Sequence, residues 1–107
     1  MKSTLALSES ELAIVQTILA EHLPVGVRVS VFGSRAGGDP KPWSDLDLAL
    51  HSQSPMVFEP LPLALMAMLA EAFDEALLPW KVDLVDRGTV SEAFGRIIDQ
   101  TSVPLLE

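Results

Sequence analysis

The chain has 107 residues, of which 15 are acidic and 7 basic, for a formal net charge of −8 at pH 7, and it contains no cysteine. This length predicts one domain over residues 1–107, and the acidic balance argues against nucleic acid as the main partner, because nucleic-acid affinity depends on clustered Lys and Arg. Because the chain has no cysteine, disulfides and thiolate metal sites are excluded. The most apolar run, Leu61–Ala70, is too short to cross a bilayer. We therefore expect a soluble cytoplasmic protein without membrane contact.

The first predicted element is a helix over Glu9–His22. Ser8 and Glu11 form a capping-box pattern at its start, in which each side chain can bond to the backbone amide of the other residue. Apolar residues then recur at helical spacing, and Pro24 and Gly26 end the pattern.

A strand is predicted over Val27–Phe32, where valines alternate with polar residues. Gly33-Ser34 breaks this alternation. The glycines and prolines between that turn and Trp43 can continue neither a helix nor a ladder, which predicts a loop.

A second strand is predicted over Ser44–His51. Because successive strand side chains point to opposite faces, we expect Asp45 and Asp47 to share one face and the intervening leucines to share the other. One face therefore belongs to the core. The other face holds two carboxylates that repel each other unless a cation lies between them.

A proline-containing connection over Ser52–Pro62 leads to a predicted helix, Leu63–Leu78, which Pro79 ends. This helix is apolar on more than one face, so it either packs between two layers of core or offers a surface for a homodimer or a hetero-oligomer. The overall hydrophobic content of 49% leaves the same two alternatives open, because it fits both an Ala- and Leu-rich core and an apolar surface that faces a partner.

A third short strand is predicted over Lys81–Asp86, with Asp83 and Val85 on one face. Thr89–Glu92 has a second capping-box pattern, and apolar residues after it line one face of a helix. The tail, Ser102–Glu107, is expected to be extended.

Three carboxylates thus fall on predicted strands: Asp45, Asp47 and Asp83. If the third strand pairs beside the second, all three can converge on one face of the sheet. Hard oxygen ligands on a rigid sheet suit Mg²⁺ or Mn²⁺, with phosphates and water completing the coordination. Such a site supports phosphoryl or nucleotidyl transfer with two metal ions.

The turn at Gly33-Ser34 supplies a second part of the candidate site. A glycine lets backbone amides approach a phosphate closely, and the Ser34 hydroxyl adds a donor. Ser44, directly before Asp45, can either cap the loop or contact a phosphate.

With GSRAGG, SDLDLAL and VDLV in this order, the chain resembles the minimal nucleotidyltransferase family, a branch of the DNA polymerase β-like superfamily. The resemblance covers nearly the whole chain. It implies an α+β fold with a polymerase β-like nucleotidyltransferase core, in which helices flank a small mixed β-sheet. It also implies that Asp45, Asp47 and Asp83 are the catalytic residues and metal ligands, and that Gly33 and Ser34 bind the nucleotide.

The family further implies ATP as substrate, Mg²⁺ or Mn²⁺ as cofactor, and a small helical HEPN protein as partner. Members that resemble this chain act as antitoxins, and some transfer AMP to a tyrosine of the partner toxin. The chain departs from the family pattern at Gly37, where members commonly carry Arg or Lys. Arg35 is the candidate to compensate, and with Ser44 it completes the predicted nucleotide-binding residues.

Two functions remain open from the sequence. The first is an enzyme that transfers AMP from ATP to a hydroxyl of a partner protein, for which the complete set of carboxylates argues. The second is a catalytically weak or inactive module of the same fold that neutralises a helical partner by binding it, for which Gly37 argues.

Overall fold

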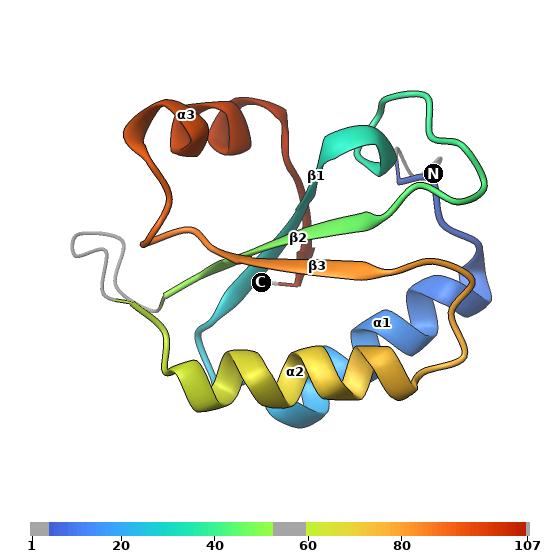
Figure 1. Ribbon diagram of the computed structural model, residues 1–107, viewed down its shortest axis with the longest axis horizontal. Helices are drawn as coiled ribbons and strands as arrows, with labels where there is room; N and C mark the ends of the chain where they lie inside the picture. Colours follow the sequence, from blue (N-terminus) through green and yellow to red (C-terminus); the bar gives the residue numbers. More distant parts are fainter. Residues whose placement is uncertain (1–4, 53–59, 107) are drawn as a thin grey trace.

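The protein folds into a four-stranded sheet with helices on both faces (Figure 1). The computed structural model describes residues 5–52 and 60–106. Its elements in chain order are α1 (Glu9–His22), β1 (Arg28–Phe32), the 3₁₀ helix η1 (Gly33–Arg35), β2 (Leu46–His51), α2 (Leu63–Glu75), β3 (Val82–Asp86), α3 (Glu92–Thr101) and β4 (Val103–Leu106). The predicted connection over Ser52–Pro62 lies largely outside the described residues.

The strands are ordered β3-β2-β1-β4. β1 is antiparallel to both β2 and β4, whereas β2 and β3 are parallel. The mixed sheet of the predicted α+β fold is therefore confirmed. Over Val103–Leu106 the tail is extended as predicted, and this segment also pairs with β1 as an edge strand, which its sequence did not indicate; Glu107 lies outside the described residues.

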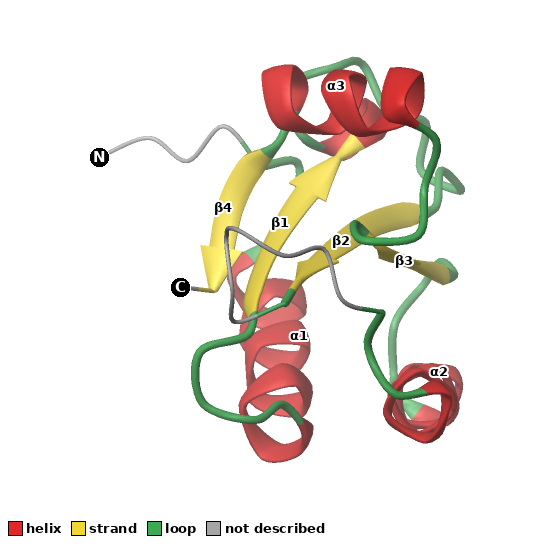
Figure 2. Ribbon diagram, turned by 90° about the vertical axis from the view of Figure 1, so that its left-hand side faces the viewer, coloured by secondary structure: helices red, strands yellow, loops and turns green. Residues whose placement is uncertain are grey.

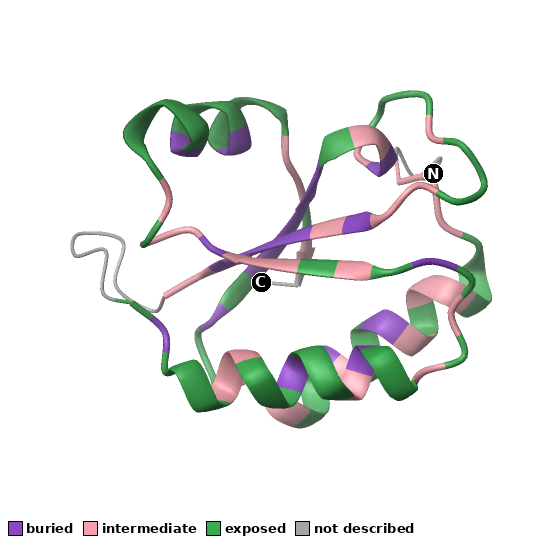
Figure 3. Cartoon of the chain, in the orientation of Figure 1, coloured by how far each residue is buried: buried purple, intermediate pink, exposed green. Residues whose placement is uncertain are grey.

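α1 and α2 cover one face of the sheet, and α3 lies over part of the other (Figure 2). The larger core cluster lies on the face of α1 and α2, where alternate residues of β1 and β2 meet both helices; its buried members are Val15, Leu19, Val27, Val29, Val31, Leu46, Leu48, Leu50, Leu61, Leu69, Phe73 and Trp80. A smaller cluster of Phe32, Ala49 and Ile98 lies beneath α3. The buried residues concentrate on the two central strands (Figure 3).

The predicted first helix and its capping box are confirmed. The Ser8 hydroxyl accepts a hydrogen bond from the Glu11 amide at 3.1 Å, and the Glu11 carboxylate accepts one from the Ser8 amide at 2.9 Å. These two bonds satisfy amides that would otherwise lack a partner in the first turn.

α2 is three residues shorter than the predicted Leu63–Leu78. Ala76 is extended, with φ −75° and ψ 154°, and its amide donates to the Phe73 carbonyl, which closes the last turn of the helix before Pro79 is reached. Leu69 and Phe73 are buried against the sheet, whereas Leu63 and Met68 are exposed. The helix is therefore not packed between two layers of core within the described residues.

Two further boundaries differ from the predictions. β2 begins at Leu46 rather than Ser44, so Asp45 lies directly before the strand. α3 is capped by Ser91, which accepts from the Phe94 amide at 3.2 Å, rather than by a box that begins at Thr89. The Thr89 hydroxyl instead donates to the Asp86 carbonyl at 3.0 Å.

No helix in the described part of the chain is long and apolar enough to span a membrane.

Candidate active site

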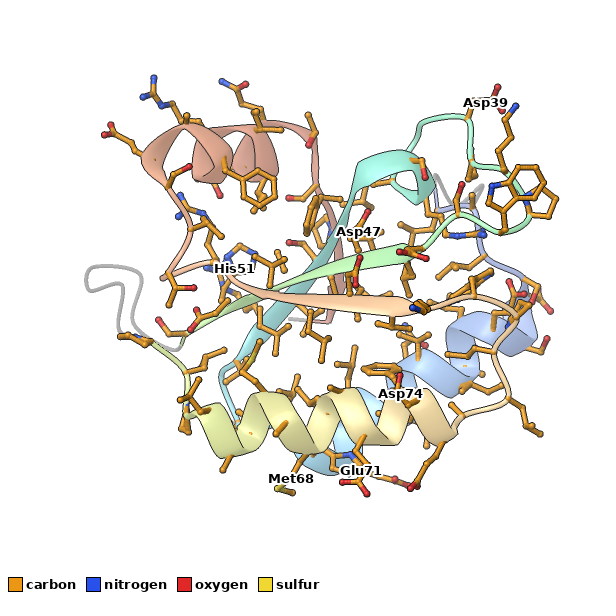
Figure 4. The ribbon with its side chains drawn as sticks, in the orientation of Figure 1. Asp39, Asp47, His51, Met68, Glu71 and Asp74 are labelled. Carbon is orange, nitrogen blue, oxygen red and sulfur yellow. The ribbon has the colours of Figure 1, made fainter. Side chains whose placement is uncertain are left out.

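Asp47 and Asp83 lie side by side on two neighbouring strands. The parallel register of β2 and β3 pairs Asp47 with Asp83. Their neighbours along the strands belong to the core cluster on the face of α1 and α2, so both carboxylates lie on the other face, where Figure 4 labels Asp47. Asp47 is half-buried and Asp83 is exposed. The predicted pairing of the second and third strands is therefore present, and it places two of the three carboxylates together.

Like charges and burial act together on Asp47. Burial raises the pKa of this carboxyl above its usual value, and the charges of Asp83 and Asp45 and a hydrogen bond with Asp83 raise it further. Without a cation, burial and the neighbouring carboxylates therefore disfavour the charged form of Asp47.

The chemistry of these donors fits Mg²⁺ or Mn²⁺. In the described part of the chain, no three Asp, Glu or His side chains converge with the geometry of a complete metal site. The neighbouring carboxylates of Asp47 and Asp83 suit Mg²⁺, which is usually held by one or two carboxylates together with substrate phosphates and water. Asp47 and Asp83 would be two neighbouring ligands of the metal ion. Asp45 lies close enough for its charge to raise the pKa of Asp47.

Gly33 lies against Asp47 at the start of η1. Phe32 pairs with Asp47 across the β1–β2 ladder, so the next residue turns past the carboxylate. Gly33 has φ +76°, a conformation that favours glycine, and a Cβ at this position would overlap the Asp47 carboxylate, with the Asp47 Cγ at 3.3 Å. The predicted phosphate turn and the predicted metal ligand are therefore in contact.

Ser44 closes the loop ahead of Asp45. Its hydroxyl accepts a hydrogen bond from the Lys41 amide at 2.8 Å, and its own amide donates to the Lys41 carbonyl at 3.0 Å. Of the two roles that the sequence left open for Ser44, capping the loop is the one that this geometry provides. Asp45 lies directly before β2, between this loop and the strand, and its charge acts on Asp47.

Arg35 has a different place from the one that its sequence position suggested. Its side chain is only 6% exposed and donates to backbone carbonyls of the loop and of the N-terminal segment. The guanidinium also lies over the ring of Trp80, 4.7 Å from its centroid. These contacts engage the guanidinium within the protein, in place of the predicted role of Arg35 as a nucleotide ligand.

Gly37 leaves the turn without a basic side chain. It has φ +109°, and a Cβ at this position would meet no atom within 4 Å. The space at Gly37 is therefore open, and its backbone conformation is one that favours glycine.

Sequence reasoning missed the contact between Arg35 and Trp80. The two residues lie far apart along the chain, and neither the spacing nor the type of either residue predicts their contact. It also missed a polar pair on the face of the sheet that carries Asp47, where the Ser30 hydroxyl and His51 Nε2 are 2.8 Å apart. Burial and the positive charge of Arg28 lower the pKa of His51.

Comparison with known proteins gives a consistent result. Residues 12–105 match the family of nucleotidyltransferase domains. A Haemophilus influenzae protein named probable protein adenylyltransferase MntA is 46% identical over 103 residues, which cover 96% of this chain and 85% of that protein.

Solved structures share the fold. One is a minimal nucleotidyltransferase, with a TM-score of 0.63 and 29% identity over 89% of each chain. Another is a toxin–antitoxin crystal structure with AMP-PNP, with a TM-score of 0.69 and 23% identity over 88% of this chain and 71% of that one. A third is the toxin–antitoxin MntA-HepT, with a TM-score of 0.58 and 20% identity over 92% of this chain and 71% of that one.

Proposed function

This chain belongs to the nucleotidyltransferase domain family, and we propose that it transfers AMP from ATP to a tyrosine hydroxyl of a helical HEPN toxin and so acts as the antitoxin. Membership of this family confirms the predicted enzyme class. The relative named as a protein adenylyltransferase supports AMP as the transferred group and a protein as the acceptor. The toxin–antitoxin structures, one of them with AMP-PNP, support the partner class and the nucleotide through likeness of fold.

The single observation that carries the proposal is the contact between the carboxylate pair and the glycine turn. Asp47 and Asp83 are paired across β2 and β3, and Gly33 lies against Asp47. A phosphate chain bound at the backbone amides of Gly33 and Ser34 would therefore lie beside two carboxylates. A nucleotidyltransferase needs this neighbourhood, because the triphosphate and its cations must occupy the same site.

We assign the roles as follows. Asp45, Asp47 and Asp83 would hold Mg²⁺ or Mn²⁺, which when bound neutralises the triphosphate and lowers the pKa of the attacking hydroxyl. Gly33 and Ser34 would bind terminal phosphates through backbone amides and the Ser34 hydroxyl. Asp83 is the exposed member of the carboxylate pair, so it is placed to accept the proton of the acceptor.

The reaction balances without a further reagent. The acceptor oxygen forms a bond to the α-phosphorus of ATP, the bond from that phosphorus to the bridging oxygen breaks, and pyrophosphate leaves. The hydroxyl proton passes to the carboxylate of Asp83, which later releases it to water.

The experiment combines the protein with labelled ATP, Mg²⁺ and the small helical protein encoded beside it. We expect label on the partner, and we expect Asp45→Ala to abolish it. Asp74→Ala is the matched control, because Asp74 is an exposed carboxylate on α2, which covers the opposite face of the sheet (Figure 4). The control should label the partner as fully as the wild type does.

The second candidate function is the binding module, which the glycine at Gly37 favours because no basic side chain there can meet the triphosphate. It predicts a tight complex with the partner, no transfer of label, and no effect of Asp45→Ala. That set of results would rule out the enzyme proposal and retain the partner.

A further inference from the structure

Among residues 5–52 and 60–106, Arg35 is the one basic residue that is buried. A charged side chain is expensive to remove from water unless it is fully hydrogen-bonded. The position of Arg35, directly after Gly33-Ser34 in η1, therefore calls for a reason beyond general stability.

The guanidinium of Arg35 donates to four backbone carbonyls on two segments. Nε donates to the Ser44 carbonyl at 3.0 Å, and Nη2 lies 3.3 Å from the Lys41 carbonyl and 3.4 Å from that of Pro42. Nη1 donates to the Ala6 carbonyl at 2.8 Å. The loop before Asp45 is thus tied to η1 and to the segment that precedes α1.

The same guanidinium also reaches the segment before β3. It lies over the ring of Trp80, which is buried, at a distance typical of a cation–π contact. The next residue, Lys81, accepts a hydrogen bond from the Leu46 amide at 2.9 Å, and this bond holds the start of β2 against the start of β3. One side chain therefore contacts the residues that lead into both carboxylate-bearing segments.

The three carboxylates differ in how they are held. Asp47 is fixed by ladders on both sides, because β2 pairs with β1 and with β3. Asp45 is held on its C-terminal side by the bond from the Leu46 amide to the Lys81 carbonyl, whereas on its N-terminal side it follows the loop that Arg35 holds. If the contact between Arg35 and Ser44 were lost, Asp45 would be the carboxylate free to move.

We propose that Arg35 is a positioning residue for nucleotidyl transfer, which anchors the loop ahead of Asp45 and thereby holds the Asp45 carboxylate beside Asp47. This inference rests on the proposed function for its meaning, but the anchoring itself can be tested without transfer. Arg35 contacts neither nucleotide nor metal in this assignment. It acts through Asp45, as outer residues around a metal site do.

The test compares Arg35→Met with Leu69→Ala as a control of matched instability. Leu69 is fully buried in α2, under the opposite face of the sheet, so its loss lowers the melting temperature without touching the loop. Binding of Mn²⁺ in the presence of AMP-PNP is measured at a temperature where both variants are folded. We expect Arg35→Met to weaken Mn²⁺ binding by about tenfold or more, and Leu69→Ala to leave it near the wild-type value.

Two further variants test whether Arg35 acts through Asp45. Asp45→Asn should weaken Mn²⁺ binding to a similar degree, and the double variant Arg35→Met/Asp45→Asn should bind little worse than either single variant. Arg35→Lys should restore part of the binding, because lysine keeps the charge but lacks the planar set of donors that reaches several carbonyls at once. Effects of Arg35→Met and Asp45→Asn that simply multiply would show independent action and would overturn the proposal.

Amide hydrogen exchange separates this proposal from the proposed function. In Arg35→Met, the amides of Lys41 and Ser44 should exchange faster while the amides of β2 remain protected, and in Leu69→Ala the loop amides should be unaffected. If the loop amides stay protected without Arg35, the proposal is wrong whatever the enzyme does. If the wild type binds no Mn²⁺ with AMP-PNP, the metal assignment fails, and the exchange data still decide whether Arg35 holds the loop.

Discussion

Replacing Gly33 with alanine tests the contact on which the proposed site depends. The added Cβ would overlap the Asp47 carboxylate, and Gly33 also has φ +76°, where a residue with a side chain is strained. β2 is held on both sides by neighbouring strands, so its backbone cannot yield. The side chain of Asp47 would therefore rotate away from its place beside Asp83.

The two consequences of this substitution differ in size. The left-handed conformation destabilises an alanine by about 1–2 kcal/mol, and the reduced freedom of the unfolded chain offsets about 0.4–1 kcal/mol of that. The overlap itself adds little, because the flexible end of the Asp47 side chain can move. We expect a net loss of about 1 kcal/mol, which lowers the melting temperature of a domain this size by about 5 °C. Displacing Asp47 should meanwhile reduce transfer by about 100-fold.

Gly37→Ala is the matched control. Gly37 has φ +109°, so alanine is strained there as well, but its Cβ would meet no atom within 4 Å. Thermal unfolding, Mn²⁺ binding with AMP-PNP and pyrophosphate release are measured for both variants. We expect similar losses of stability and a loss of metal binding and turnover in Gly33→Ala alone. Equal turnover in the two variants would refute the reasoning, because the contact with Asp47 would then carry no function.

Three further predictions follow from the electrostatics and the core. In EDTA, Asp47→Asn should raise the melting temperature. The pKa of Asp47 is raised in the folded protein, so the wild type loses stability as pH rises from the unfolded value of 3.8 through the folded one. A melting temperature of Asp47→Asn below that of the wild type at neutral pH would contradict this. Asp99→Asn should lower stability by about 1 kcal/mol or less, because Asp99 is half-exposed in its ion pair with Arg87 at 2.8 Å. The hydrogen bond from Arg87 lowers the pKa of Asp99, so the stability difference between wild type and variant should be present above pH 3.8 and should shrink as pH falls through the lowered value. Chemical denaturation at several pH values measures this difference, and a difference that stays constant with pH would count against the assignment. Leu69→Ala should lose about 2–5 kcal/mol by leaving a cavity, yet keep its affinity for AMP-PNP, and a matched loss of affinity would show that α2 supports the site more closely than its packing indicates.

Much of the fold could be predicted because its signals are local. The Ser8–Glu11 capping box predicted the first residue of α1, and alternation of Leu and Asp in β2 predicted which side chains enter the core. The Gly33-Ser34 turn was recognised because its residue types suit a close approach of the backbone. Such features depend on neighbours within a few residues, where spacing and residue type are informative.

Element ends were less predictable. The position of Asp45 changed from strand to loop because β2 begins where its ladder with β3 begins, at Leu46 and Val82. α2 ends at Glu75, three residues before the end that Pro79 predicted, because Ala76 is already extended. For β2, a contact outside the periodic segment thus decided the boundary.

By itself the sequence determined the three carboxylates, the glycine turn and the faces of the strands that carry them. Only the tertiary structure decided that Asp83 lies beside Asp47, and that Arg35 is buried against Trp80 and the loop rather than directed toward a phosphate. The reason is physical: these contacts join residues far apart along the chain, as the hydrogen bond from Arg35 to the Ala6 carbonyl does across 29 positions. No local pattern encodes such a contact, because burial of a charge depends on which carbonyls the folded chain brings around it.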